Sequence, residues 1–299
     1  MNSAIHPLAS CKTGQLQEIV QIIVKAVGPE YVYVLGVWYT RQQSYNIFSE
    51  NDVSFQQVSH YDLLVLLPAG DRRNIDEVQD IIESRCRLHT PVTTIIFSVS
   101  HFNELSASGH PFCQMVYSEA LMVYESGHSA LAAPQTLNSS RMHVIAAQAY
   151  EKWIEGASEF LAGAGLYIMR KQWNMAAFML HQAAERSYVA MIQVITGYRA
   201  GTHNLEKLYR YARNYSAGIY QLFPRNNEKE ERLFRQLQKA YIHSRYKDDY
   251  NITGPEIQEL ADRVTKLLEL VKQVCEIKLS ALSSAKALQA ELRCFGKAV

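Results

Sequence analysis

Cysteine is sparse and unpaired in this sequence. The five cysteines among its 299 residues are odd in number, and none stands in a CxxC pair; they are Cys11, Cys86, Cys113, Cys275 and Cys294. This spacing lacks the patterns of a zinc site and of a disulfide framework. Scattered single cysteines are typical of reduced thiols in the cytoplasm, which is the location we expect.

Long hydrophobic runs and leader-like features are also missing. No uninterrupted apolar stretch approaches the roughly 18 residues of a membrane-spanning helix. The first residues, MNSAIHPLASCKTG, lack the basic start and the apolar run of a signal peptide. We therefore expect neither a membrane partner nor export from the cytoplasm.

Neither sign of charge dominates the chain, whose formal net charge is +1. Residues 1–140 carry 7 Lys and Arg against 13 Asp and Glu, a net of −6, whereas residues 141–299 carry 23 against 16, a net of +7. This asymmetry and the length both predict two domains. The basic half has the charge to attract nucleotides or nucleic acid, but its interspersed acids favour a solvated, mixed helix surface.

The first half, residues 1–127, is predicted to be an α+β domain with a small mixed sheet. Apolar residues at helical spacing predict helices, and runs of β-branched and aromatic residues predict strands. The expected order is α-β-β-α-β-α-β. The expected elements are helices at 16–27 and 74–88, strands at 31–39, 62–67 and 91–100, a hairpin or long loop at 41–59, and a short helix followed by a last strand within 111–127.

The second half is predicted to be all-α. Residues 128–140 are small and polar and form the expected linker. From 141 to 299, long helical patterns follow one another with short connections, which is typical of an antiparallel helical bundle. The last of these helices is long enough that we expect it to reach the surface of a partner.

The stretch HYDLLVLLP, residues 60–68, reads as a buried strand with polar residues at its start. Because side chains alternate along a strand, His60 and Asp62 are predicted to point the same way. Two acids in these places would hold a metal for phosphoryl transfer, but only Asp62 is an acid. The alternative for Asp62 is an acid bonded to a nearby backbone N–H, and the alternative for His60 is a surface loop residue.

The residues around this strand carry a resemblance to a known superfamily. A strand ending in Gly-Ser, then a strand that opens Asp-x-Asp, is the pattern of nucleotidyltransferases of the DNA polymerase β superfamily, whose small bacterial members often read SDIDLLV. This chain reads SHYDLLV: Asp62 falls on the second acid and Gly36 on the glycine, but His60 replaces the first acid and Val37 the serine. The resemblance also implies a third acid at 91–98, where there is none.

These departures bear on catalysis. Mg²⁺ prefers hard oxygen ligands, and an imidazole suits other metals better. Without the third acid, the usual general base is missing as well. We therefore expect a degenerate domain without catalysis. The alternative is an active enzyme that moves a nucleoside monophosphate from a nucleoside triphosphate to a small molecule or a protein. Asp62 would then hold Mg²⁺, helped by His60 or by Glu50 and Asp52.

Landmarks in the second half closely resemble the HEPN domain (higher eukaryotes and prokaryotes nucleotide-binding domain). They span about seventy residues in the expected order: His181-Gln182-Ala183-Ala184-Glu185, Gly197 closing that helix, Thr202-His203-Asn204-Leu205 opening the next, and Tyr241 with Ser244-Arg245-Tyr246. The resemblance implies a helical bundle that pairs as a homodimer. HEPN domains often sit beside a nucleotidyltransferase domain, so each resemblance supports the other.

The resemblance also bears on which residues could form a functional site. Many HEPN proteins are ribonucleases whose motif is an arginine followed, after four to six residues, by a histidine. Here seven residues separate Arg235 from His243, and three separate Arg199 from His203. The ribonuclease motif is therefore absent. Arg can grip phosphate while an aromatic ring stacks on a base. The expected nucleotide- or phosphate-binding residues are Gly36, His181, Glu185, His203, Arg210, Arg245, Tyr246 and Lys247.

Each of these residues also has an alternative structural role. His181 and Glu185 stand at i and i+4 and can form an internal pair. His203 can fix its loop through hydrogen bonds, and Thr202 or Asn204 can be a helix N-cap. Overall, the sequence predicts a non-catalytic nucleotide-binding or regulatory protein. An active nucleotidyltransferase and a toxin–antitoxin component are the alternatives.

Overall fold

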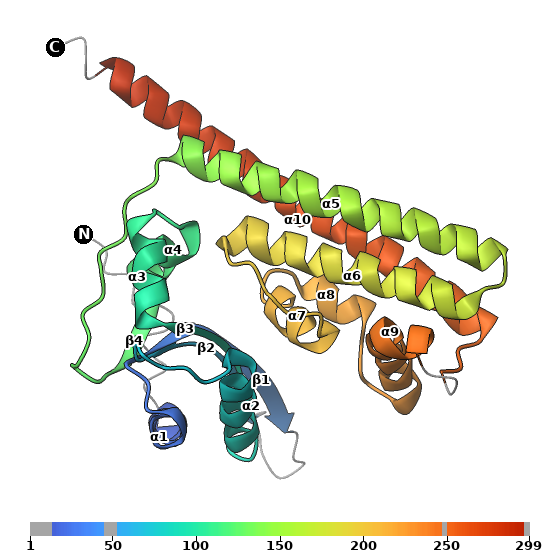
Figure 1. The fold of residues 1–299 in the computed structure, drawn as a ribbon, viewed down its shortest axis with the longest axis horizontal. Coiled ribbons are helices and arrows are strands. Elements are labelled where there is room, and N and C mark those ends of the chain that lie inside the picture. Colours follow the sequence, from blue (N-terminus) through green and yellow to red (C-terminus); the bar gives the residue numbers. More distant parts are fainter. Residues whose placement is uncertain (1–13, 45–52, 247–249, 296–299) are drawn as a thin grey trace. The chain divides into compact units, whose positions relative to one another are not determined.

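The chain divides into two compact units, Met1–Thr136 and Leu137–Val299. The structure is a computed structural model that describes the backbone of residues 14–44, 53–246 and 250–295 and the side chains of residues 14–40, 57–244 and 250–285. Each unit has its own architecture, which Figure 1 shows in sequence colours.

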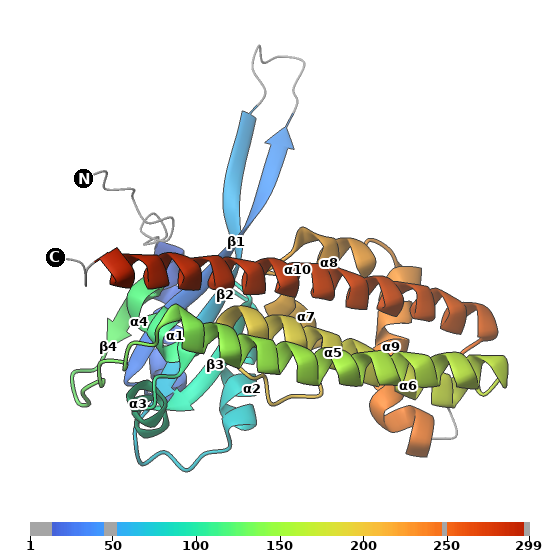
Figure 2. The ribbon, with the colours of Figure 1, turned by 90° about the horizontal axis from the view of Figure 1, so that it is seen from above.

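Unit 1 is built on a four-stranded mixed sheet in the order β3-β2-β1-β4. Strand β1 pairs antiparallel with β2 and with β4, and β2 pairs parallel with β3. The strands are β1 Tyr31–Ser44, β2 Val53–Leu67, β3 Val92–Ser98 and β4 Leu121–Glu125. The far arms of β1 and β2 project from the sheet as a two-stranded ribbon, seen most clearly in Figure 2.

Two helices, α1 Gly14–Val27 and α2 Ile75–Cys86, cover one face of this sheet. Their apolar sides meet alternate residues of the strands, and the resulting core cluster includes Ile19 and Ile23 of α1, Ile82 of α2, and Leu63 and Val65 of β2. Residues of β2 between those in the cluster, Asp62 among them, point to the opposite face because side chains alternate along a strand. The buried apolar run of β2 thus leaves its first acid on the face away from α1 and α2.

The predicted small mixed sheet with helices is confirmed, with one correction. Of the hairpin or long loop predicted at 41–59, the described residues 41–44 and 53–59 form a hairpin that continues β1 and β2. The strand predicted at 91–100 ends at Ser98, where the Ser98 hydroxyl accepts from the backbone N–H of His101 and starts helix α3, Val99–Ala107. Helix α4, Pro111–Glu119, and strand β4 follow as predicted.

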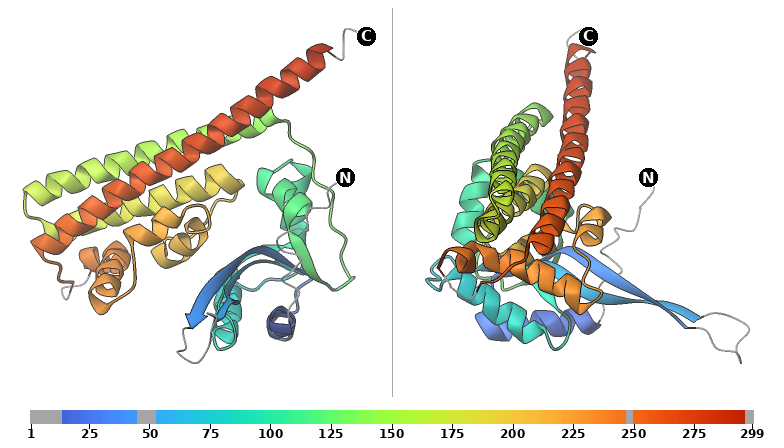
Figure 3. Two further views of the ribbon diagram at one scale, coloured as in Figure 1. Left: turned by 180° about the vertical axis from the view of Figure 1, so that it is seen from behind. Right: turned by 90° about the vertical axis from the view of Figure 1, so that its right-hand side faces the viewer.

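Unit 2 is all-helical. Its helices are α5 Ser139–Met169, α6 Trp173–Thr196, α7 Leu205–Ala212, α8 Ala217–Leu222, α9 Glu228–Tyr246 and α10 Gly254–Phe295. Helix α6 is largely buried, with Leu180, Tyr188 and Met191 fully inaccessible, and α5, α7, α9 and α10 pack against it. Helix α10 continues past the start of α5, as Figure 3 shows.

The directions of the long helices differ in part from a simple antiparallel bundle. Helices α5 and α6 are antiparallel neighbours joined by a tight turn at Lys171, whose φ is 56°. Helices α6 and α10 begin side by side, since Gly254 at the start of α10 lies against the ring of Trp173 at the start of α6. From there the two helices run in the same direction (Figure 1). The short helix α8 was not predicted from the sequence.

Candidate functional site

Three strands of unit 1 bring together the positions that the nucleotidyltransferase resemblance marks. Asp62 in β2 is the backbone partner of Gly36 in β1 on one side and of Thr93 in β3 on the other. Thr93 therefore stands on the strand where the resemblance implies a third acid. Asp62 and His60 are both buried, at 5% and 7% exposure.

The side chains at this point form a small polar cluster. The Trp38 indole N–H donates to Asp62 Oδ2 at 3.3 Å. The Nε2 atom of His60 lies 2.8 Å from Thr93 Oγ1 and 3.6 Å from Asp62 Oδ1. Asp62 Oδ1 is buried without a hydrogen-bond partner among the described residues. His60 and Asp62 therefore point the same way, as predicted.

Two of the alternative interpretations are wrong. His60 is a buried strand residue and not a surface loop residue. Asp62 accepts from the indole of Trp38, and none of its described hydrogen bonds comes from a backbone N–H.

Gly36 is adjacent to this carboxylate. The register of β1 against β2 shifts between Val34 and Gly36, so Leu35 forms a bulge. A Cβ atom at position 36 would lie 3.1 Å from Asp62 Oδ2, which is tighter than most Cβ contacts in proteins. In this arrangement, Gly36 makes room for the Asp62 side chain.

The described residues of this cluster do not suit Mg²⁺. One carboxylate, one imidazole and one hydroxyl offer few hard oxygen ligands, and the indole N–H already occupies one carboxylate oxygen. Across the residues that the structure describes, no group of three or more His, Cys, Asp and Glu side chains is placed to hold a metal ion. Glu50 and Asp52, the helpers suggested for an active enzyme, lie outside the described residues.

A second polar cluster lies in unit 2 around Glu185 of α6. The Nδ1 atom of His203 is 2.9 Å from Glu185 Oε1, and the Nε2 atom of His181 is 3.4 Å from Glu185 Oε2. His181 is fully buried, and its Nδ1 lies 2.9 Å from the backbone carbonyl of Leu237 in α9. Both predicted structural roles are confirmed: His181 pairs with Glu185, and His203 fixes its loop by a hydrogen bond.

Rings of this cluster are stacked on one another. The ring of His203 lies 4.9 Å from that of Tyr241, with an interplanar angle of 10°. The ring of His181 lies 5.3 Å from that of Tyr241, at 30°. The side chain of His203 is 61% exposed, whereas that of His181 is fully buried. The stack of three rings therefore begins at a ring open to solvent and ends at one packed inside the bundle.

The charge state of Glu185 follows from its partners. Burial raises the pKa of Glu185, but hydrogen bonds and charge interactions with His181 and His203 outweigh it, so the pKa lies below its ordinary value of 4.5. The carboxylate is thus ionised at neutral pH.

The backbone between α6 and α7 places His203. Gly197 ends α6 in the left-handed conformation with φ 79°, as the sequence predicts for a closing glycine. Asn204 is the N-cap of α7 and accepts from the backbone N–H groups of Glu206 and Lys207. The Thr202 hydroxyl accepts from the N–H of Asn204.

The predicted phosphate ligand Arg210 already has a carboxylate partner. Its Nε lies 3.1 Å from Glu206 Oε1. Glu206 also pairs at 2.6 Å with Arg225, whose guanidinium lies over the rings of Tyr209 and Phe234 at 4.7 and 4.5 Å. Sequence reasoning missed Arg225, because nothing in its local sequence marks this contact.

The remaining predicted ligands are not placed. Helix α9 ends at Tyr246, but the side chains of Arg245 and Tyr246 lie outside the described ones, and Lys247 lies outside the described residues altogether.

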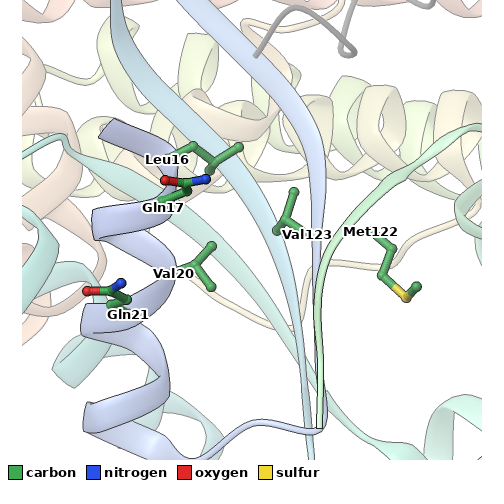
Figure 4. A pocket seen from close by; sticks show the side chains of 6 residues that line it. All are labelled: Leu16, Gln17, Val20, Gln21, Met122 and Val123. Atoms are coloured by element: carbon green, nitrogen blue, oxygen red, sulfur yellow. The ribbon is translucent and has the colours of Figure 1, made fainter. Parts of the chain in front are cut away.

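One pocket of about 540 Å³ in unit 1 has no titratable side chain in its lining. Its lining comes from α1 and β4, as Figure 4 shows, and consists of Leu16, Gln17, Val20, Gln21, Met122 and Val123. None of these side chains is titratable, so this pocket supplies no acid, base or cation for a reaction.

Comparison with known protein families identifies the second unit. Residues 150–277, from within α5 to within α10, match the HEPN domain. This part of unit 2 is therefore a HEPN domain, as its landmarks imply. None of the curated proteins matches the chain. Among the described residues, no helix has both the length and the apolar character needed to cross a membrane.

Proposed function

We propose that this protein is a non-catalytic nucleotide-binding or regulatory protein that joins a degenerate nucleotidyltransferase domain to its HEPN domain. The observation that carries the proposal is the Glu185 cluster, where an exposed histidine ring, a stacked tyrosine and an ionised carboxylate meet. The cluster of Asp62 supports the absence of catalysis.

The degenerate nucleotidyltransferase domain is proposed for unit 1 because of where its residues lie on the sheet. Gly36 and Asp62 lie side by side at the places that the resemblance gives to the glycine and the second acid, and the neighbouring Thr93 lies on the strand where it implies a third acid. The shape of that site is consistent with common ancestry, but three groups that the reaction needs are missing. His60 stands in place of the first acid, Val37 stands in place of the serine, and the strand at 91–98 has no acid.

Nucleotide binding is proposed for unit 2 because the side chains of the Glu185 cluster can stack on a base and hydrogen-bond to it. Stacking of a base on an aromatic side chain contributes about 1–3 kcal/mol and tolerates any base. The exposed face of His203, backed by Tyr241, is such a platform. A carboxylate oxygen of Glu185 accepts from an amino group on the edge of a base, as acidic side chains do for cytosine.

Isothermal titration of the full chain with ATP, GTP, CTP and UTP, with and without Mg²⁺, tests the proposal. We expect heat of binding that does not require Mg²⁺, that is reduced in His203→Ala, and that persists in Asp62→Asn. No heat with any of the four nucleotides would refute nucleotide binding.

An active nucleotidyltransferase is the second candidate, and one observation favours it: Asp62 Oδ1 is buried and lacks a hydrogen-bond partner among the described residues. Such an atom is costly unless something binds it. Under this alternative, the protein releases pyrophosphate from a labelled nucleoside triphosphate, and Asp62→Asn abolishes the release. That result would replace our proposal.

The HEPN domain also fits a toxin–antitoxin component and a homodimer. Light scattering of the purified chain gives the oligomeric state, and we expect a dimer formed through unit 2. Growth arrest on expression of the chain, together with RNA cleavage, would favour the toxin role over a binding protein.

A further inference from the structure

A second group of charged residues in unit 2 gathers around the indole ring of Trp153 in α5. Three cations lie over this one ring: Lys152 Nζ at 5.3 Å, Arg186 Cζ at 5.6 Å and Arg199 Cζ at 5.5 Å. They come from α5, from α6 and from the segment that joins α6 to α7. We call these four residues the Trp153 cluster.

The framework of the Trp153 cluster is fixed. The indole N–H of Trp153 donates to Gln193 Oε1 of α6 at 2.8 Å. The Arg186 guanidinium also lies 5.0 Å from the ring of Phe160 and passes directly over Gly156, where an added Cβ would be 2.6 Å from Nη1. The close packing of α5 on α6, side by side in Figure 1, therefore holds Arg186 in place.

The cations of the Trp153 cluster lack acidic partners. In the part of unit 2 that the structure describes, none of Lys152, Arg186 and Arg199 has an ion pair, and Arg186 Nε is buried with no hydrogen-bond partner. Two other arginines of the unit do have acidic partners: Arg225 and Arg263 each lie 2.6 Å from a glutamate oxygen.

This charge arrangement is unfavourable without an anion. A cation over an exposed aromatic ring gains about 0.5–1 kcal/mol. Three like charges gathered on one ring repel one another, and a buried donor without an acceptor adds a further cost. An anion bound beside the exposed cations of the cluster offsets their mutual repulsion.

We propose that the Trp153 cluster binds a phosphate group, either of a free nucleotide or of an RNA strand. Phosphate matches the cluster better than a single carboxylate does, because it has more acceptor oxygens and up to two negative charges, and because guanidinium groups grip it bidentately.

This site is separate from the Glu185 cluster and goes beyond the proposed function. Arg186 and Glu185 are neighbours in sequence but point to different sides of α6. Arg186 contacts α5, through Trp153 and Phe160, whereas Glu185 contacts His203 in the loop before α7. A phosphate can therefore bind one side of the helix whether or not a base stacks on the other.

The test uses the full chain and three probes: inorganic pyrophosphate, ATP, and a labelled single-stranded RNA of mixed sequence. The variants are Lys152→Gln and Arg199→Gln, whose side chains are on the surface, and the double variant. Lys266→Gln is the control, since Lys266 is exposed on α10 and takes no part in the described contacts of the Trp153 cluster. Thermal unfolding checks that each variant is folded.

We expect each substitution to weaken binding about tenfold, as loss of one charged hydrogen bond does. For RNA, the dependence of log K on log salt becomes shallower by about 0.7 for each cation removed. Weakened RNA binding with unchanged ATP and pyrophosphate binding identifies a strand as the source of the phosphate. Weakened ATP and pyrophosphate binding identifies a free nucleotide.

Two results would overturn the inference: no binding of any probe by the wild-type protein, or variants that bind every probe as tightly as Lys266→Gln does. His203→Ala keeps this test distinct from that of the proposed function. If the Glu185 cluster alone binds nucleotide, His203→Ala weakens ATP binding while Lys152→Gln leaves it unchanged.

Discussion

His203 and Glu185 lie 2.9 Å apart, Nδ1 to Oε1, although they belong to a loop and to the middle of a buried helix. This contact ties the connection between α6 and α7 to the centre of the bundle. Its strength depends on the ionised state of Glu185, whose pKa is below its ordinary value of 4.5.

Glu185→Gln is expected to lower the free energy of unfolding at pH 7 by about 1–3 kcal/mol, because it weakens charged hydrogen bonds in a buried place. A carboxyl with a lowered pKa in the folded state stabilises above its ordinary pKa, and this contribution is lost as pH falls. The difference in free energy of unfolding between the wild-type protein and the variant should therefore shrink as pH falls below about 4.5 and through the lower folded-state pKa. Urea unfolding at several pH values, with exposed Glu269→Gln as the control, measures it. A deficit that stays constant from pH 7 to pH 3 would contradict the prediction.

Arg225→Met should destabilise unit 2 far more than Arg235→Met does. Arg225 is largely enclosed by Glu206, Tyr209 and Phe234, so its removal leaves a half-buried carboxylate without its main partner, at a cost of about 2 kcal/mol or more. Arg235 pairs with Glu231 on an exposed helix surface, where such pairs contribute about 0.3–0.5 kcal/mol. Paired denaturant titrations measure the difference, and equal losses would show that the enclosure of Arg225 has no effect.

Gly36→Ala should destabilise unit 1 by about 1 kcal/mol, because the new methyl group crowds the buried Asp62 carboxylate. Its effect should be smaller when Asp62 is already alanine, since the contact is then gone. A double-mutant cycle measures this coupling by chemical unfolding. Gly70→Ala, where no atom lies within 4 Å of the added Cβ, is the control. Additive effects of the two changes would argue against the close contact.

The three cysteines with described side chains should resist modification in the folded protein. Burial raises the pKa of the Cys86 and Cys113 thiols to about 11 and that of Cys275 to about 12. The thiolate is the reactive form, so little of it exists at pH 8. Alkylation with iodoacetamide followed by mass spectrometry, with and without urea, locates the label. Rapid labelling of these three positions without urea would show that the packing around them is looser than described.

Much of the fold could be predicted from periodicity. Alternation along SHYDLLV placed His60 and Asp62 on one side of β2, and apolar spacing located the long helices. Helix α3 was missed because Ser98 both ends a strand and caps the helix, with no break in the sequence between them. Helix α8 was missed because six residues with only Ile219 buried carry no readable period.

The partners of the site residues could not be predicted in the same way. The bond from Trp38 to Asp62 depends on the register of two strands, and that register shifts at two places. Only i, i+4 spacing made the pair of His181 and Glu185 visible in the sequence. The Trp153 cluster joins three distant segments through helix packing, which leaves no local pattern.

The segment from Gly197 to Asn204 has one further consequence. It carries Arg199 to the ring of Trp153 and His203 to the carboxylate of Glu185, and it is held at its two ends by a left-handed glycine and a helix cap. A ligand that draws Arg199 away from Trp153 therefore pulls on the same short span of backbone that orients His203. Any resulting change in affinity would be reciprocal, so each ligand would report on the presence of the other.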